Sequence, residues 1–328
     1  MVAEPTECSL AIVDNRVGNM GMKPPESSPR RRYLETKSLL AQTKRLLRHF
    51  NLRARKGLGQ HFLIDEEVLE LITSAAELAP TDIVMEIGPG LGVLTRELAK
   101  QVGWLAAIEL DSKLAASLKQ TLASFSNVTI INEDILKIDP ATLLQQQQAR
   151  FPAAIGSPFS YKVVANLPYY ITSPVLRHFL EASIKPQIMV VMVQKEVAEA
   201  IVAEPGQMSL LTISVQFYGK PVIINYVPAR CFYPAPEVDS AILKVALYPK
   251  PAVEVTDERD FFNLVRAGFT ASRKQFCNSL SQGLGLPKTE VLSLLQKAGI
   301  MPQRRAETLT LEEWAQLWQV FTQLEEGK

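Results

Sequence analysis

The sequence predicts an α/β fold, in which a mostly parallel sheet carries helices on both faces and a small helical domain follows. Two observations predict it. Short apolar segments with strand character alternate with amphipathic helical segments between Ile83 and Ala203, at intervals of roughly 20–25 residues. After Pro249-Lys250-Pro251 only helical patterns remain, with glycines and a proline between them. A sheet flanked by helices, with a C-terminal helical domain, is the simplest architecture that fits.

The expected elements follow in chain order. The strands are predicted at Ile83–Gly88, Trp104–Leu110, Val128–Asp134, Lys162–Leu167 and Gln187–Gln194, closed by an antiparallel pair at Val222–Val227 and Ala241–Tyr248. The helices are predicted at Glu66–Leu78, Leu91–Gln101, Ser112–Phe125, Pro174–Glu181, Glu196–Ala203, Glu258–Thr270, Lys274–Leu280, Lys288–Lys297 and Leu311–Glu325. Asp65 is the expected N-cap of the first of these helices. Residues 135–160 are expected to form a loop-rich insertion.

Composition divides the chain into three predicted parts. Residues 1–34 contain several Pro, Gly and Ser and are expected to form a flexible extension, before an α/β domain over 35–249 and a helical domain over 250–328. Residues 1–60 hold twelve Lys and Arg against five acids, although the net charge of the whole chain is only +1. Such a segment either binds a polyanion or is a solvated basic tail. The apolar side of its amphipathic part consists of Leu39, Leu40, Leu46, Leu47 and Phe50.

The cysteines and histidines are few and dispersed. They are Cys8, Cys231, Cys277, His49, His61 and His178. Their spacing fits neither a disulfide framework nor a zinc site, so no metal is expected. No apolar run approaches the ~18 residues that a membrane span needs, and the N-terminus has no apolar signal core. We therefore expect a soluble protein of the reducing cytoplasm, with no membrane partner.

A glycine-rich loop, Val84-Met85-Glu86-Ile87-Gly88-Pro89-Gly90-Leu91-Gly92, lies between the first strand and its helix. Glycines such as Gly88 and Gly90 at this position let the backbone pass close to a ligand. A dinucleotide-binding enzyme would carry a further glycine where this chain has Val93. That difference, with the preceding Glu86, favours a Rossmann-like class I methyltransferase sheet that binds S-adenosylmethionine. A tight strand-to-helix turn without a ligand is the alternative.

Two further acids follow the next two predicted strands. Glu109 could accept hydrogen bonds from both hydroxyls of a ribose, and its alternative role is a solvated acid near a helix N-terminus. Asp134 could accept from the amino group of an adenine. Three successive strand ends thus carry the groups that such a cofactor needs, which favours a cofactor site over coincidence.

The fourth strand ends in Val164-Ala165-Asn166-Leu167-Pro168-Tyr169-Tyr170. The exocyclic N6 of adenine is a poor nucleophile because its lone pair is delocalised into the ring. Acceptors for its two hydrogens favour a pyramidal nitrogen, and the Asn166 side-chain oxygen and the Leu167 carbonyl are the candidates. Pro168 stiffens the turn without an N–H of its own, and Tyr169 offers a ring for base stacking. A simple strand-ending turn is the alternative.

This chemistry requires alignment more than proton transfer. After methyl transfer the nitrogen is cationic and loses its proton readily, so no strong general base is needed. Holding the nitrogen and the methyl carbon in line could lower the barrier by up to roughly 7–11 kcal/mol. The lack of a catalytic His or Cys motif elsewhere agrees with this scheme.

These motifs resemble those of the 16S ribosomal RNA adenine N6,N6-dimethyltransferases, the family whose loss gives kasugamycin resistance. The resemblance covers residues 35–328. It is carried by Lys56-Gly57-Leu58-Gly59-Gln60-His61-Phe62-Leu63, which is similar to the family's K-S-L-G-Q-N-F-L, by the unchanged N-L-P-Y at 166–169, by the F-x-P-x-P-x-V-D-S motif at 232–240, and by Ser272-Arg273-Lys274 with Asn278-Ser279-Leu280 in the basic helix of the small domain.

The resemblance implies site residues. The cofactor contacts would be His61, Leu63, Gly88, Glu109, Asp134 and Asn166. Phe232 would be a second aromatic residue facing the target base, and its alternative role is core packing. His61 stands where the family usually has Asn, and an imidazole can still donate or accept a hydrogen bond. A contact from the backbone at that position would be unaffected.

The resemblance also implies a substrate. It is a hairpin loop near the 3′ end of 16S ribosomal RNA, in a late assembly particle of the small ribosomal subunit, where two adjacent adenines are dimethylated. Four methyl transfers would be needed, with cofactor exchange between them. An unpaired loop adenine costs little to extrude. The helical domain would bind RNA, and we expect a monomer.

Three alternatives differ in class. A related methyltransferase that modifies large-subunit RNA and confers macrolide resistance is disfavoured by the motif at 232–240 and by the helical tail. A non-catalytic RNA-binding factor is disfavoured by intact Glu109, Asp134 and Asn166–Tyr169. A nucleotide-dependent oxidoreductase is disfavoured by Val93. Target mapping on both RNAs and cofactor-dependent thermal stability separate these possibilities.

Overall fold

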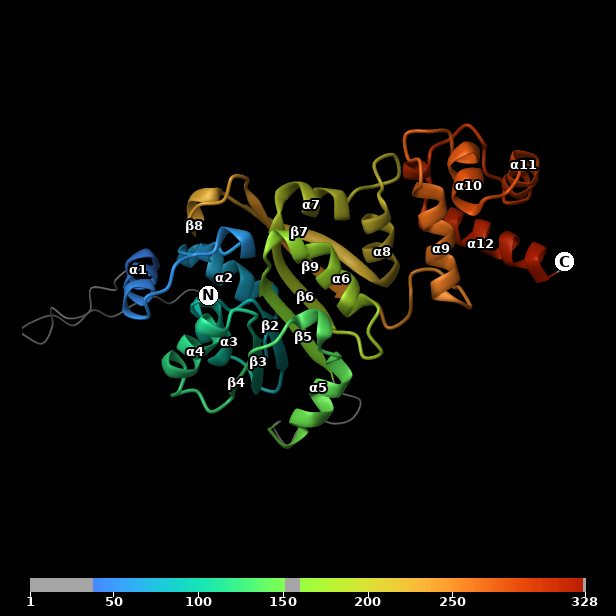
Figure 1. Ribbon diagram of the computed structural model, residues 1–328. Helices are drawn as coiled ribbons and strands as arrows, with labels where there is room; N and C mark the ends of the chain where they lie inside the picture. The colour runs from blue at the N-terminus through green and yellow to red at the C-terminus, as the bar shows by residue number, and fades with distance from the viewer. Residues whose placement is uncertain (1–37, 151–159, 327–328) are drawn as a thin grey trace, which may run out of the picture. The chain divides into compact units, whose positions relative to one another are not determined.

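Within residues 38–150 and 160–326, which the computed structural model describes, the strands form a seven-stranded sheet in the order β4-β3-β2-β5-β6-β9-β7. They are β2 (Ile83–Ile87), β3 (Trp104–Ile108), β4 (Val128–Ile131), β5 (Tyr161–Asn166), β6 (Ile188–Gln194), β7 (Gly219–Val227) and β9 (Ser240–Leu247). The strands β2 to β6 pair in parallel, and β9 and β7 close the sheet in antiparallel pairing (Figure 1). The predicted α/β fold is confirmed, including its closing pair.

Helices precede, connect and follow the strands. They are α1 (Leu39–His49), α2 (Glu66–Ala75), α3 (Val93–Ala99), α4 (Ser112–Thr121), α5 (Pro140–Gln147), α6 (Thr172–Leu180), α7 (Lys195–Ile201), α8 (Leu210–Tyr218), α9 (Glu258–Phe269), α10 (Phe276–Leu284), α11 (Lys288–Lys297) and α12 (Leu311–Glu326). The predicted cap is confirmed, because the Asp65 side chain accepts a hydrogen bond from the Val68 N–H at the start of α2.

Three helices lie outside the predicted list: α1, which falls in the basic amphipathic stretch, and α5 and α8. The prediction of a loop-rich insertion over 135–160 is wrong for α5. This helix begins at Pro140, and the side chain of its N-cap, Asp139, accepts from the Thr142 N–H. The helix α8 has a capping box formed by Ser209 and Thr212. Its sequence is rich in β-branched and aromatic residues, which have modest helix propensity, so burial rather than propensity accounts for it. Residues 151–159 of the predicted insertion lie outside the described residues.

The core lies on both faces of the sheet. Along β2, Ile83, Met85 and Ile87 belong to one buried cluster, which also contains residues of α5, α6 and α8. The intervening Val84 belongs to another cluster, formed with residues of α2 and α3. Successive side chains of a strand point to opposite faces, so the alternation places helices on both faces.

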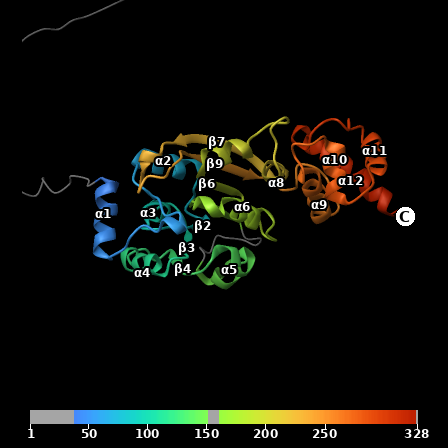
Figure 2. The same ribbon diagram turned by 45° about the horizontal axis from the view of Figure 1, so that its top comes forward.

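The helices α9 to α12 form a group after the last strand, in both views (Figures 1 and 2). Aromatic side chains join this group to α8, since the ring of Phe217 stacks on Phe261 and that of Tyr218 stacks on Phe262. The described residues therefore form one compact unit, and the predicted division near residue 249 stays a prediction. The predicted extension over 1–34 lies outside the described residues.

A second, two-stranded sheet pairs β1 (Phe62–Leu63) with β8 (Phe232–Tyr233) in antiparallel fashion. It brings the segment that follows α1 next to the segment between β7 and β9. In the described part of the chain, none of the helices has the length and apolar content that crossing a membrane requires.

Candidate active site

A cavity of about 330 Å³ lies at the carboxyl ends of the parallel strands. Its wall includes Ile87 at the end of β2, Ile108 at the end of β3, Asp134 beyond β4 and Asn166 at the end of β5. The residues 58–63 form another part of the wall. The chain order reverses between β2 and β5, and open α/β sheets bind ligands at such a point. The volume suits a small organic cofactor.

The glycine-rich loop forms one side of the cavity. Gly88 and Gly90 both have positive φ, +67° and +59°, which other residues adopt only with strain. A Cβ on Gly90 would lie 3.1 Å from the Phe62 ring, which lines the cavity as well. Glycine is therefore required here both by backbone conformation and by close packing, as the sequence predicted for a loop that approaches a ligand.

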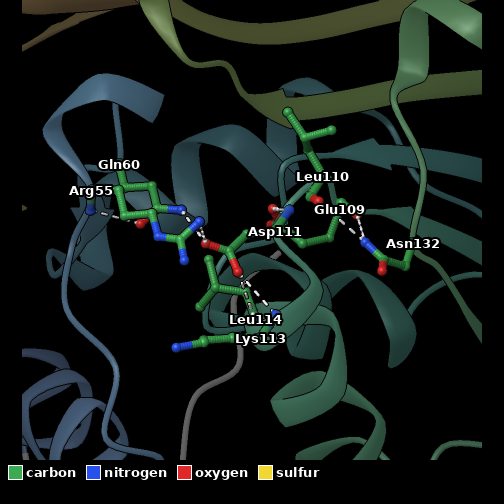
Figure 3. Close-up of polar contacts among 8 residues, drawn as sticks. All are labelled: Arg55, Gln60, Glu109, Leu110, Asp111, Lys113, Leu114 and Asn132. Atoms are coloured by element: carbon green, nitrogen blue, oxygen red, sulfur yellow. Dashed lines mark hydrogen bonds and ion pairs between the residues drawn. The ribbon is translucent and has the colours of Figure 1, made fainter.

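Glu109 follows β3 directly and is buried (Figure 3). Its Oε1 accepts a hydrogen bond from the Asp111 N–H at 2.9 Å, and its Oε2 accepts from the Gly90 N–H at 3.1 Å. Burial raises the pKa of this carboxyl, and the two N–H donors act in the opposite direction. Each carboxylate oxygen has a second lone pair, so both oxygens keep capacity for donors from a ligand.

Asp134 lies beyond the end of β4, which stops at Ile131 rather than at residue 134 as predicted. It is half-buried, and its side chain accepts from the Leu136 N–H at 3.0 Å as the N-cap of a short 3-10 helix (Ile135–Lys137). The side chain of Asn132 donates to the Glu109 carbonyl at 2.8 Å and so ties the ends of β3 and β4 together. Both acids predicted for the cofactor thus line the same cavity.

The Asn-Leu-Pro-Tyr turn lies at the end of β5 and lines the cavity with all four residues. The Asn166 Nδ2 donates to the His61 backbone carbonyl at 3.0 Å, so its side-chain oxygen is the acceptor that stays available. Within the described residues no donor is found for the Leu167 carbonyl. A Cβ on Gly88 would lie 3.6 Å from Pro168 Cδ, so the glycine loop and this turn are in contact.

Tyr169 and His61 form an aromatic pair at the cavity. Their rings are stacked, with centroids 5.9 Å apart and an interplanar angle of 19°. The Tyr169 hydroxyl bonds to Ser240 Oγ at 2.7 Å, and burial raises the pKa of this phenol. The His61 Nδ1 lies 2.8 Å from the Pro234 carbonyl, and a carbonyl only accepts, so Nδ1 carries the hydrogen. This hydrogen bond fixes the ring of His61, the residue that stands where the family usually has Asn.

Leu63 and Phe232 differ in whether they line the cavity. Leu63 in β1 and Phe232 in β8 are register partners, and both side chains belong to one buried cluster. Leu63 lines the cavity, whereas Phe232 is 2% exposed and is absent from the cavity wall. The structure therefore does not bring Phe232 to face a base. Its burial in the cluster with Leu63 favours the alternative role, core packing.

The sequence interpretation left three features of the wall unassigned. Glu86 is fully buried, and its Oε2 has no hydrogen-bond partner among the described residues. Gln60 lines the cavity and donates a hydrogen bond to Asp111, which is not among the lining residues. Leu110 and Tyr170 are large exposed apolar side chains at the cavity, 51% and 54% exposed. A helix N-cap signal at Asp111 was present in the sequence, but its long-range partners were not.

Comparison with known proteins agrees with this geometry. The family model described as ribosomal RNA adenine dimethylase matches residues 51–323. A ribosomal RNA small subunit methyltransferase A of Dehalococcoides mccartyi is 54% identical over 288 residues, 88% of this chain and 95% of that protein. The protein of the same name from Moorella thermoacetica is 44% identical over 282 residues, 84% of this chain and 95% of that protein.

Two solved structures share the fold. The 23S rRNA methyltransferase ErmE is 29% identical with a TM-score of 0.61, over 80% of this chain and 99% of that one. A dimethyladenosine transferase from Plasmodium falciparum has a TM-score of 0.66 at 24% identity, over 80% of this chain and 98% of that one. Because the family model covers most of the chain and the relatives match it nearly end to end, this chain belongs to the ribosomal RNA adenine dimethylase family.

Proposed function

We propose that this enzyme transfers methyl groups from S-adenosylmethionine to N6 of two adjacent adenines in a hairpin loop near the 3′ end of 16S ribosomal RNA. One observation carries the proposal. A single cavity is lined both by the acids Glu109 and Asp134 and by the turn Asn166–Tyr169. A cofactor held by the first pair and a base held by the turn would therefore meet in one place.

The donor and acceptor groups of the cavity fit this cofactor. Glu109 keeps lone pairs for a ribose diol, and Asp134 offers a carboxylate oxygen to an adenine amino group. Glu86 lines the cavity, and in the described part of the chain its buried Oε2 has no hydrogen-bond partner, which suits a ligand with an amino or ammonium group. Bound here, S-adenosylmethionine would supply a methyl carbon attached to a sulfonium.

The chain's own part in the reaction is to orient the acceptor nitrogen. The Asn166 amide is held by the His61 carbonyl, so its oxygen is the group that can accept one N6 hydrogen. The Leu167 carbonyl can accept the other. Two fixed acceptors favour a pyramidal nitrogen whose lone pair points away from them, and they cost no reorganisation during the reaction. The Tyr169 ring, anchored through its hydroxyl to Ser240, would stack on the base.

The RNA would be bound outside the cavity by cationic side chains. Arg273 and Lys274 are exposed in the turn between α9 and α10, and α1 carries Arg45 and Arg48 on its exposed side. Such residues bind phosphates without regard to sequence and position the hairpin, while the cavity selects the base. We propose that the enzyme acts as a monomer in the cytoplasm, on a late assembly particle of the small subunit.

The test is methyl transfer to purified under-methylated small subunits, with the modified nucleotides located by mass spectrometry. The expected product is dimethyladenosine at two neighbouring positions near the 3′ end of the 16S RNA. Large-subunit RNA is the comparison substrate, because ErmE is a 23S rRNA methyltransferase. Modification confined to the large-subunit RNA would overturn the proposed substrate, and no transfer to either RNA would overturn the proposed reaction.

A further inference from the structure

The carboxylate of Asp111 divides its two oxygens between two elements (Figure 3). Oδ1 accepts from the Lys113 and Leu114 N–H groups, at 2.9 and 3.4 Å, and so caps α4. Oδ2 accepts from Gln60 Nε2 at 3.4 Å and lies 3.2 Å from Arg55 Nη1. One oxygen therefore serves the helix, and the other serves a segment far away in the sequence.

That segment, residues 55–60, is closed on itself by Gln60. The Gln60 Oε1 accepts from the Arg55 N–H at 2.9 Å, while its Nε2 reaches Asp111. Leu58, Gly59 and Gln60 all line the cavity. We call residues 55–60 the 55–60 loop.

The 55–60 loop also touches the other side of the cavity. A Cβ on Gly59 would lie 3.4 Å from Pro168 Cβ and 3.5 Å from Tyr170 Cδ1, so the loop packs against the Asn-Leu-Pro-Tyr turn. At its other end, Asp111 donates its N–H to the carboxylate of Glu109. The loop thus spans from the acid that would hold the ribose to the turn that would hold the base.

We propose that Asp111 is a positioning residue, which fastens the 55–60 loop through Arg55 and Gln60 as a wall of the cofactor site. The proposal rests on the function proposed above and adds a role for Asp111, which is not among the residues that line the cavity. With the loop fastened, His61 and Leu63, which follow it directly, are held in the cavity wall. With the loop released, the cofactor would lose one side of its site.

Asp111 rather than Arg55 is the residue that holds the loop, because the Asp111 side chain is buried and the Arg55 side chain is exposed. The Asp111 side chain is 5% exposed and the Arg55 side chain 53% exposed, so the ion pair alone is weak and easily screened. A buried carboxylate oxygen nevertheless needs donors, and in this fold both donors of Oδ2 come from the 55–60 loop. Because the buried Oδ2 of Asp111 takes its donors from the 55–60 loop, these bonds hold the loop in place.

Two isosteric substitutions test this contact. Asp111→Asn keeps Oδ1 and hence the helix cap, because Asn caps helices as well as Asp, but it replaces the acceptor Oδ2 by a donor. Gln60→Glu keeps the acceptor for the Arg55 N–H and replaces the donor Nε2 by an oxygen that faces Asp111. In the double variant, Asp111→Asn with Gln60→Glu, the amide and the carboxylate exchange places and can bond again.

The readout is the dissociation constant for S-adenosylmethionine by calorimetry on the full chain without RNA, so that an Arg55–phosphate contact cannot contribute. Each single variant is expected to bind the cofactor about tenfold more weakly, since hydrogen bonds to a charged acceptor are lost. The double variant should recover most of that loss. With small subunits as substrate, KM for the cofactor should rise by a similar factor.

The matched control is Asp139→Asn, since Asp139 caps α5 through Thr142 and has no bond to the 55–60 loop. Cofactor affinity within twofold of the wild type in a folded single variant would overturn the proposal, and so would a double variant that binds no better than the weaker single one. If Asp111→Asn fails to fold, Gln60→Glu and its recovery in the double variant decide alone. A wild-type chain that binds no cofactor would instead overturn the proposed function.

Discussion

Asn166 Nδ2 donates a hydrogen bond to the backbone carbonyl of His61, at 3.0 Å, and so joins the end of β5 to the segment before β1. An amide whose nitrogen is held in this way presents its oxygen to the cavity side, because the two ends of the amide are opposed. The bond uses the backbone of His61, so it does not depend on which side chain stands there. A histidine is thus compatible with the same orientation of Asn166.

We predict that Asn166→Ala lowers kcat by about 100-fold or more, while the dissociation constant for S-adenosylmethionine changes less than about fivefold. The reason is that the substitution removes an acceptor fixed for the transition state, and such a loss typically costs about 10²–10³ in rate. Single-turnover methyl transfer and calorimetry separate the two quantities.

The control for this prediction is Asn225→Ala, on the exposed edge strand β7. This variant should keep the wild-type rate. Turnover of Asn166→Ala at the wild-type level would remove the side-chain acceptor from the mechanism and leave the Leu167 carbonyl as the candidate.

Phe232 offers a second prediction. Because its ring is 2% exposed and packs in the cluster with Leu63, Phe232→Ala should lower the free energy of unfolding by about 3–5 kcal/mol. Phe232→Leu keeps much of the volume and should cost less than about 2 kcal/mol, with methyl transfer nearly unchanged. Denaturant unfolding and methyl transfer on the same samples check both.

The two roles of Phe232 give opposite results for the leucine variant. If the ring faces the target base, replacing it slows methyl transfer even though the fold is intact. A folded Phe232→Leu protein with normal cofactor affinity and at least tenfold slower methyl transfer would therefore restore the base-facing role.

The strands and the two acids that line the cavity could be predicted because their signals are local. Each strand is a short apolar run, and the position directly after it, such as Glu109, lies at the carboxyl edge of the sheet in any parallel arrangement. The turn at Asn166 was found for the same reason. Since parallel strands share one edge, residues found separately along the chain come together at one cavity.

Features that depend on tertiary placement could not be predicted. Gln60 and Asp111 are 51 positions apart, and nothing local in either segment indicates the other. The helix α8 consists of residues with modest helix propensity that the core buries, so its pattern alone does not distinguish it from a strand. Whether Phe232 faces the cavity or the core depends on the pairing of β1 with β8, two strands that lie far apart in the sequence and that no local pattern connects.

A third prediction concerns RNA binding. Replacing Arg273 and Lys274 together by alanine should weaken RNA affinity at low salt and should lower the slope of log affinity against log salt concentration by about 1.5, because two phosphate contacts are lost. The cofactor affinity should be unchanged. Filter binding over a range of salt concentrations measures the slope.

Arg177→Ala is the control, because Arg177 is an exposed arginine that pairs with Glu181 on α6 at 3.2 Å. An unchanged slope for the double variant at Arg273 and Lys274 would show that this turn does not contact phosphates. The helical domain would then need another surface for RNA.

The last prediction follows from Glu86. Burial raises the pKa of this carboxyl to about 8, although the Thr95 side chain lowers it, and the nearby charge of Glu109 adds to the rise. In the unfolded chain a glutamate titrates near its ordinary value of 4.5, so between that value and about 8 the folded state binds more protons than the unfolded state. The contribution of Glu86 is thus most favourable below pH 4.5, and it falls as pH rises until it levels off above about 8.

Glu86→Gln removes this titration while keeping the shape of the protonated side chain. Relative to the wild type, the variant should therefore gain stability steadily as pH rises from about 5 to 8, by a few kcal/mol at the upper end, since each unit of pKa difference corresponds to about 1.4 kcal/mol. Denaturant unfolding at several pH values, without cofactor, measures the difference. The exposed Glu254→Gln should give a constant difference over the same range. If the stability difference between Glu86→Gln and the wild type is also constant over this pH range, Glu86 is ionised in the folded protein. A buried charge of that kind would need a partner, which the cavity would have to provide.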